Sequence, residues 1–161
     1  MRCIIDANIL IDLSQGGVLP YLFRLPIQVE APTVVLDEMI EPDRNILLEM
    51  GVKQSDLTAE QILEAARMNA ADTHLSLGDC SAFIAARDEK IALLTGDRRL
   101  RKRAEETGIE VHGVLWILGE IEAAGLLTGP ALAASLRRML EEGARLPAEE
   151  CAQRFKRWEG T

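Results

Sequence analysis

The sequence predicts an α/β fold, a three-layer α/β/α sandwich with a short central parallel sheet and extra C-terminal helices. Short apolar segments alternate along the chain with segments of helical character, which is the pattern of βαβ crossovers. No linker, internal repeat or low-complexity tract interrupts the 161 residues, a length typical of one domain. The chain is 48% hydrophobic and 27% charged, which favours a packed core over general disorder.

Four segments are predicted to form the strands of this sheet. Residues 2–6 (RCIID) are a short β-branched run, and residues 27–31 (IQVEA) lie between two prolines. Residues 91–95 (IALLT) are almost uninterrupted in their hydrophobicity, and residues 109–112 (IEVH) form a fourth, shorter segment. Continuous apolar runs of this length are typical of parallel strands that are buried on both faces.

Helices are predicted around these strands, and residues suited to N-capping mark where several of them begin. Thr33 and Asp97 each suit an N-cap position, and Thr58 and Ser76 each open a capping-box pattern. The predicted helices cover residues 7–13, 18–25, 33–39, 44–50, 58–68, a segment that starts at 76, 97–108, 115–124, and two segments that open near 128 and 147.

Four acidic residues that are distant in sequence are expected at one rim of the sheet. Asp6 ends the first strand, and Asp97 follows the third strand after a Thr-Gly turn. Glu38 lies early in the helix after the second strand, and Asp79 lies in the first turn of the helix that leads to the third. Crossover topology brings these strand ends and helix starts to the same edge, where ligands of such sheets gather.

A cluster of four carboxylates requires a compensating charge, because the anions repel each other and burial raises their pKa values. A divalent cation removes that cost, and a set of oxygen ligands suits Mg²⁺ or Mn²⁺ rather than zinc. Two such ions about 4 Å apart can hold the attacking and leaving oxygens of a phosphodiester. The sequence therefore predicts a metal-dependent hydrolytic site that needs neither histidine nor cysteine.

Each acid also has an ordinary structural interpretation. Asp97 can cap the following helix, Asp79 can complete the capping box of Ser76, and Glu38 can be a solvated helix residue. Asp6 is harder to explain in this way, because a carboxylate at the end of an apolar strand is costly without a partner. Capping and metal binding are compatible, so these interpretations do not remove the metal site.

A basic segment, residues 98–103 (RRLRKR), follows Asp97 in a chain whose net charge is −8. Most of these cations are predicted to form the solvated surface of a helix, and only Arg98 and Arg99 are candidates for binding nucleic acid. The acidic net charge disfavours non-specific nucleic-acid binding. His112 is predicted to be structural, and Trp116 to be a core or interface anchor rather than a base-stacking platform.

Four segments, IIDANILIDL, VVLDEM, LSLGDCSAFIAA and LLTGDRRLRKRA, resemble the ordered acidic motifs of PIN domains. The resemblance continues through VHGVLWILGEIEAAGLL, which is similar to a prokaryotic subgroup with extra C-terminal helices. It implies a PIN-like nuclease domain over residues 1–127 and a C-terminal helical extension over 128–161, packed on the same domain.

The resemblance implies a metal-dependent endoribonuclease that hydrolyses RNA with Mg²⁺ or Mn²⁺. Asn8 and Thr95 match positions that support the metal or its water. Glu38 is preferred to the adjacent Asp37 as the second acid, because the family usually places glutamate before an apolar residue. The residues that carry over as both catalytic and metal-binding are Asp6, Glu38, Asp79 and Asp97.

The resemblance also implies an RNA substrate, a homodimer and a toxin that pairs with an antitoxin protein. The three cysteines lack metal-site spacing and fit a reduced, cytoplasmic protein, and no membrane span or signal peptide is expected. Two alternatives stay open. One is a non-catalytic PIN-like module that binds RNA or protein, and the other is a phosphatase with Asp6 as nucleophile. The phosphatase would want a second acid at the position that Asn8 occupies.

Overall fold

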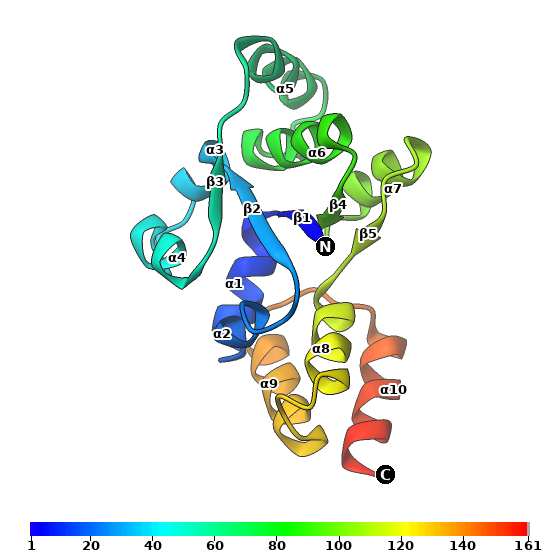
Figure 1. Ribbon diagram of the computed structural model, residues 1–161. Coiled ribbons are helices and arrows are strands. Elements are labelled where there is room, and N and C mark those ends of the chain that lie inside the picture. The colour runs from blue at the N-terminus through cyan, green and yellow to red at the C-terminus, as the bar shows by residue number, and fades with distance from the viewer. Residues whose placement is uncertain (161) are drawn as a thin grey trace.

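The computed structural model describes residues 1–160 as a five-stranded parallel sheet with helices on both sides (Figure 1). The strand order is β3-β2-β1-β4-β5, and every neighbouring pair is parallel. This confirms the predicted fold class. The strands are β1 (Arg2–Ile5), β2 (Gln28–Pro32), β3 (Lys53–Ser55), β4 (Ala92–Leu94) and β5 (Val111–His112).

The helices form two layers around this sheet. In Figure 1, α5, α6 and α7 lie on one side of it, and α1, α2, α8 and α9 lie on the other. The helices are α1 (Ala7–Gln15), α2 (Leu19–Leu22), α3 (Thr33–Asp37), α4 (Arg44–Met50), α5 (Ala59–Ala71), α6 (Leu77–Glu89), α7 (Arg98–Glu106), α8 (Val114–Ala123), α9 (Gly129–Glu141) and α10 (Ala148–Glu159).

Three details around β2 and β3 differ from the sequence expectation. The strand β3 was not predicted, because its sequence KQS has no apolar pattern and it pairs only with β2 at the sheet edge. The N-cap of α3 is Pro32 rather than Thr33, because the Thr33 hydroxyl donates to Asp56 (2.9 Å) instead of capping the helix. The helix also ends at Asp37, one residue before Glu38.

The two central strands, β1 and β4, end level with each other. Their register pairs Ile5 with Leu94, and the backbone N–H of Asp6 donates to the Leu94 carbonyl (3.1 Å). On the other side of β4, the Thr95 N–H donates to the His112 carbonyl (3.0 Å). The residues that directly follow β1 and β4 are therefore held next to each other at the carboxyl edge.

Helix α6 is the most deeply buried helix of the fold. Its middle is dominated by small residues, and Ser81, Ala82, Ala85 and Ala86 are all buried. It contacts β1, β2 and β4 as well as α3, α5 and α7. Close packing of this kind fixes the beginning of α6, which carries Asp79, relative to the sheet.

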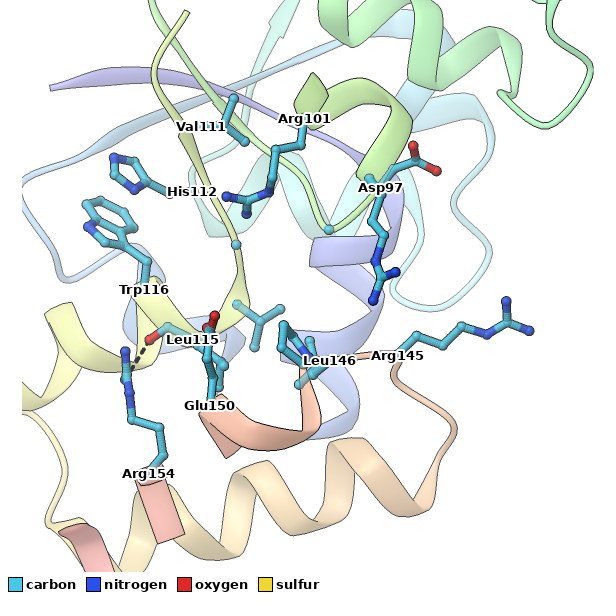
Figure 2. Close-up of a pocket in the computed structure, with 15 residues that line it drawn as sticks. Asp97, Arg101, Val111, His112, Leu115, Trp116, Arg145, Leu146, Glu150 and Arg154 are labelled. Atoms are coloured by element: carbon cyan, nitrogen blue, oxygen red, sulfur yellow. Dashed lines mark hydrogen bonds between the residues drawn. The ribbon is translucent and has the colours of Figure 1, made fainter. Parts of the chain in front are cut away.

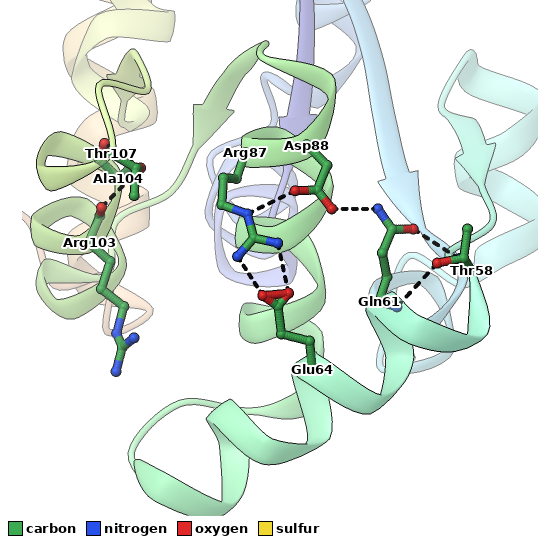
Figure 3. A network of polar contacts seen from close by, with 8 residues as sticks. All are labelled: Thr58, Gln61, Glu64, Arg87, Asp88, Arg103, Ala104 and Thr107. Atoms are coloured by element: carbon green, nitrogen blue, oxygen red, sulfur yellow. Dashed lines mark hydrogen bonds and ion pairs between the residues drawn. The ribbon is translucent and has the colours of Figure 1, made fainter.

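Helix α5 is attached to α6 through a polar network (Figure 3). The Arg87 guanidinium donates to both carboxylate oxygens of Glu64 (2.6 and 2.7 Å) and to Asp88 (2.8 Å). Gln61 donates to Asp88 (2.9 Å) and completes the capping box with Thr58 at the start of α5.

The C-terminal helices pack on the rest of the fold. Helix α9 contacts α1 and α8, and α10 contacts α9. Arg138 donates to the Gly16 carbonyl (2.8 Å), and Arg154 donates to the Leu115 carbonyl (2.8 Å). Across residues 1–160, no helix has both the length and the apolar character that crossing a membrane requires.

Candidate functional site

Asp6 lies at the centre of the carboxyl edge and is fully buried. It is the N-cap of α1, where its Oδ1 accepts a hydrogen bond from the Ile9 N–H (3.0 Å). Its Oδ2 accepts a short hydrogen bond from the Thr95 hydroxyl. Burial raises the pKa of Asp6 to about 7, although both hydrogen bonds oppose this shift. The position therefore favours either a proton or a nearby cation.

Asp97 lies beside Asp6, on the turn after β4. Its Oδ1 caps α7 by accepting from the N–H groups of Arg99 (2.8 Å) and Leu100 (3.0 Å). Its own N–H donates to the Thr95 hydroxyl oxygen (3.1 Å), so one threonine contacts both acids. Asp97 thus caps α7, as its ordinary structural interpretation expected, and it also lies at the rim of the sheet.

Asp79 also has a capping role. Its Oδ2 accepts from the Ser76 N–H (2.9 Å), and its N–H donates to the Ser76 hydroxyl (3.0 Å), which completes a capping box. Desolvation raises the pKa of Asp79, and the negative charge of Asp97 contributes to the same shift. The hydrogen bonds from Ser76 oppose it.

Glu38 reaches the same helix start from α3. Its Oε1 accepts from the Gly78 N–H (2.9 Å), directly before Asp79 in the chain. A Cβ atom at Gly78 would lie only 2.4–2.6 Å from the Glu38 carboxylate, so this approach requires glycine. The neighbouring Asp37 instead pairs with Arg44 (3.0 Å), and both acids are exposed. Of these two candidates for the second acid, Glu38 is the one that hydrogen-bonds to α6.

The acids influence one another electrostatically. The negative charges of Asp79 and Asp97 each raise the pKa of Asp6 further, and that of Asp97 raises the pKa of Asp79. Such mutual effects require the carboxylates to be near each other. The structure thus brings Asp6, Asp79 and Asp97 together, with Glu38 attached through Gly78.

The donor set suits a divalent cation in its chemistry. Within residues 1–160, no group of three or more His, Cys, Asp or Glu side chains is arranged so that it could hold a metal ion. However, one carboxylate oxygen of each of Asp79, Asp97 and Glu38 accepts from backbone N–H groups, and the second oxygen of each accepts no hydrogen bond. Carboxylate oxygens are the kind of ligand that Mg²⁺ and Mn²⁺ prefer, so these three free oxygens suit such an ion by their chemistry and not by their present arrangement.

Three further candidates have different surroundings. Asn8 is exposed on the first turn of α1, two residues after Asp6. Arg99 forms an ion pair with Asp72 (2.8 Å). Arg98 is exposed and lines a pocket next to Asp97.

This pocket has a volume of about 750 Å³ and lies between the carboxyl edge and the start of α10 (Figure 2). Its lining includes Arg101, His112 and Trp116, none of which the sequence indicated as binding residues. The only local signal was the spacing of Arg98 and Arg101, which places them on the same face of α7. The opposite wall includes Arg145 and Glu150, which are distant in sequence from the arginines of α7.

Comparison with family models identifies a family that spans nearly the whole chain. A family model described as PIN domain matches residues 2–160. A solved structure of a PilT N-terminus domain protein from the archaeon Sulfolobus solfataricus P2 is similar, with 14% identity and a TM-score of 0.49. The similarity covers 74% of this chain and 92% of that chain, and it is too distant to support an argument about function. A search of curated proteins finds no match.

Proposed function

The chain belongs to the PIN-domain family, and from this premise we propose that it is a Mg²⁺- or Mn²⁺-dependent endoribonuclease. PIN domains are commonly nucleases and typically use divalent metals. The observation that carries the proposal is the meeting of Asp6, Asp79 and Asp97 at the carboxyl edge, where the charges of Asp79 and Asp97 raise the pKa of Asp6 and the charge of Asp97 raises the pKa of Asp79. Phosphodiester hydrolysis is the reaction that this acidic set supports best, and RNA is the substrate that the family resemblance implies.

The protein side chains have separate roles in this proposal. Asp6, Glu38, Asp79 and Asp97 would hold the cation, which when bound stabilises phosphate charge and makes a bound water more acidic. Thr95 positions Asp6 and Asp97, since its hydroxyl contacts both. The backbone N–H groups of Ile9, Gly78 and Ser76 restrict rotation of the carboxylates that accept their hydrogen bonds, which belong to Asp6, Glu38 and Asp79. Asn8, which is exposed two residues after Asp6, matches a position that in the family supports the metal or its water.

The proposal extends to the biological setting that the family resemblance implies. We place the protein in the cytoplasm as a homodimer and as the toxin of a toxin–antitoxin pair. RNA is the proposed substrate, and an antitoxin protein is the proposed partner.

Cleavage of a mixed RNA panel with Mn²⁺ tests the activity directly. Wild-type protein should cleave, and Asp6→Asn and Asp79→Asn should each lose more than about 100-fold, because even residues that only hydrogen-bond to a metal ligand cost roughly 10- to 100-fold when they are replaced. Asp37→Asn is the matched control, since Asp37 pairs with Arg44 outside the acidic cluster. Unchanged cleavage by Asp6→Asn would rule out this function.

A second candidate is a non-catalytic PIN-like module that binds RNA or protein. It is favoured by the open arrangement of the acids, which among residues 1–160 form no ready group of three metal ligands. Titration with Mn²⁺ separates the two functions, because a metal that binds the folded state raises the melting temperature. A melting temperature that does not respond to Mn²⁺, together with RNA binding but no cleavage, would support the module.

A further inference from the structure

The pocket beside Asp97 is built from two distant parts of the chain. One wall comes from α7, β5 and the start of α8, and the other comes from the segment before α10 and its first turns (Figure 2). Its volume of about 750 Å³ falls in the usual range of small-ligand pockets, about 300–1,000 Å³. The pocket is therefore large enough for one nucleotide.

Three arginines of this pocket have no partner. Within residues 1–160, Arg98, Arg101 and Arg145 form no side-chain hydrogen bond and no ion pair. Arg101 is also half-buried, and Figure 2 shows its guanidinium directed into the pocket. An unpaired guanidinium that is partly removed from water favours an anion, and phosphate matches its planar donors. The pocket thus presents a positive site within an acidic chain.

An aromatic pair forms another part of the lining. The rings of His112 and Trp116 are stacked, with their centroids 3.9 Å apart and an angle of 14° between their planes. The His112 Nε2 contacts Glu110 (2.7 Å), which holds the imidazole in place. Fixed aromatic rings beside arginines are typical of sites that bind a base and its phosphate together. An acidic peptide would use the arginines but would have no need of the rings.

We propose that this pocket binds one nucleotide of a single-stranded RNA, next to the phosphate at the acidic cluster. The phosphate of that nucleotide contacts Arg101, and its base packs against Trp116, while Arg98 and Arg145 add positive charge to the lining. Asp97 belongs to the acidic cluster and also lines the pocket, so the cluster and the pocket adjoin each other. The subsite rests on the proposed ribonuclease function and deepens it, because it names the residues that bind the nucleotide next to the acidic cluster.

Glu150 gives the proposal a second, opposite test. It is the only acid besides Asp97 in the lining, and Figure 2 shows its carboxylate facing the pocket. Its negative charge repels a bound phosphate. Glu150→Gln should therefore tighten RNA binding several-fold, whereas the arginine substitutions weaken it.

The experiment measures binding without cleavage. Fluorescence anisotropy follows a labelled single-stranded RNA of roughly ten nucleotides in EDTA, a length within the range of single-strand binding sites. Arg101→Ala should weaken binding about 10-fold and reduce the slope of log K against log[salt] by about 0.7, the value for one phosphate contact. Lys102→Ala is the matched control, because Lys102 is exposed on the same helix and does not line the pocket.

Trp116 tests the base contact separately from the charge. Trp116→Leu should weaken binding roughly 5- to 100-fold without a change in the salt slope, as expected for loss of one stacked base. If this variant does not fold, Trp158→Phe offers another measurement. The chain has only two tryptophans, so its remaining fluorescence comes from Trp116 and should be quenched by RNA.

The outcomes show separately whether the nucleotide subsite exists and whether the protein is a ribonuclease. Weaker RNA binding by Arg101→Ala supports the subsite even if wild-type protein cleaves nothing with Mn²⁺, in which case the ribonuclease proposal fails alone. Mn²⁺-dependent cleavage with RNA affinity unaffected by Arg101→Ala and no quenching of Trp116 overturns the subsite alone. Equal competition by polyglutamate and by RNA also overturns it, because the pocket would then bind carboxylates.

Discussion

Asp6 shows how a single residue combines a structural and a chemical role. Its carboxylate accepts one hydrogen bond from the α1 backbone and one from Thr95, and no part of the residue is exposed. These bonds stabilise the charged form, yet burial still raises its pKa to about 7. A cation at the rim would reverse that balance, since a positive charge favours the carboxylate.

Asp12 allows a test of burial that does not involve the acidic cluster. Desolvation raises its pKa to about 6, so the folded state holds its proton more tightly than the unfolded state does. Stability from this group is present below the unfolded pKa of about 4 and falls as the pH rises to about 6. Asp12→Asn should therefore stabilise the protein near pH 7 by about 1 kcal/mol, after allowance for partial exposure.

Thermal melting of wild-type protein and Asp12→Asn between about pH 4 and 7 checks this prediction. The variant should melt roughly 2–4 °C higher near pH 7, and the difference should shrink toward pH 4. A constant difference across this range would show that Asp12 is not desolvated as described.

Residue chemistry explains why the sequence indicated Asp6 but not Arg101. A carboxylate at the end of an apolar strand is costly to bury without a partner, so the sequence alone marks this residue as unusual. Arg101 lies in a run of cations with the pattern of an ordinary helix surface, and its pocket exists only after α10 has packed nearby. The choice of Glu38 over Asp37 came from the family pattern, and its role in metal binding stays a prediction.

At the scale of elements, the start of α6 joins two acids. Glu38 accepts from Gly78, and the next residue, Asp79, closes the capping box of the same helix. The α3–α6 contact therefore sets where the Glu38 carboxylate lies relative to Asp79.

Gly78→Ala tests this junction. The added Cβ would lie 2.4–2.6 Å from the Glu38 carboxylate, so the flexible glutamate must move away while the helix stays intact. We expect a melting temperature close to that of wild type and Mn²⁺-dependent cleavage lowered roughly 10-fold. Gly96→Ala is the control near the site, because its Cβ would meet nothing within 4 Å. Equal activity of the two variants would contradict the junction.

The polar network of Figure 3 predicts how α5 is held. Arg87→Met removes three charged hydrogen bonds to Glu64 and Asp88, all partly exposed, and should cost about 1–2 kcal/mol. Melting temperature and amide exchange in α5 measure the loss. Arg67→Met on the exposed surface of α5 should change stability by less than about 0.5 kcal/mol. Similar exchange in both variants would mean that apolar packing alone holds α5.

The elements also show which parts of the fold the sequence could predict. Continuous apolar runs predicted β1 and β4, because strands at the centre of a parallel sheet are buried on both faces. The edge strand β3 is polar and is defined only by its backbone pairing with β2, which no local pattern reveals. Thr33 was wrongly expected to cap α3, because its bond to Asp56 depends on the position of β3.

At the scale of the whole molecule, the two halves of the proposed RNA path come from opposite ends of the chain. The acidic cluster is assembled from residues 6–97, whereas the pocket is closed by residues 145–154. The family match extends over residues 2–160 and includes α9 and α10. Of the two C-terminal helices, α10 lines the pocket of the proposed RNA site, whereas α9 packs against α1 and α8.

Binding of Mn²⁺ is the most direct test of the central claim, that four acids distant in sequence form one metal site. Isothermal titration should show Mn²⁺ binding to the wild type that falls at least about 10-fold in each of Asp6→Asn, Glu38→Gln, Asp79→Asn and Asp97→Asn. Asp37→Asn should bind as the wild type does. Absence of Mn²⁺ binding, or equal binding by all five variants, would contradict the account.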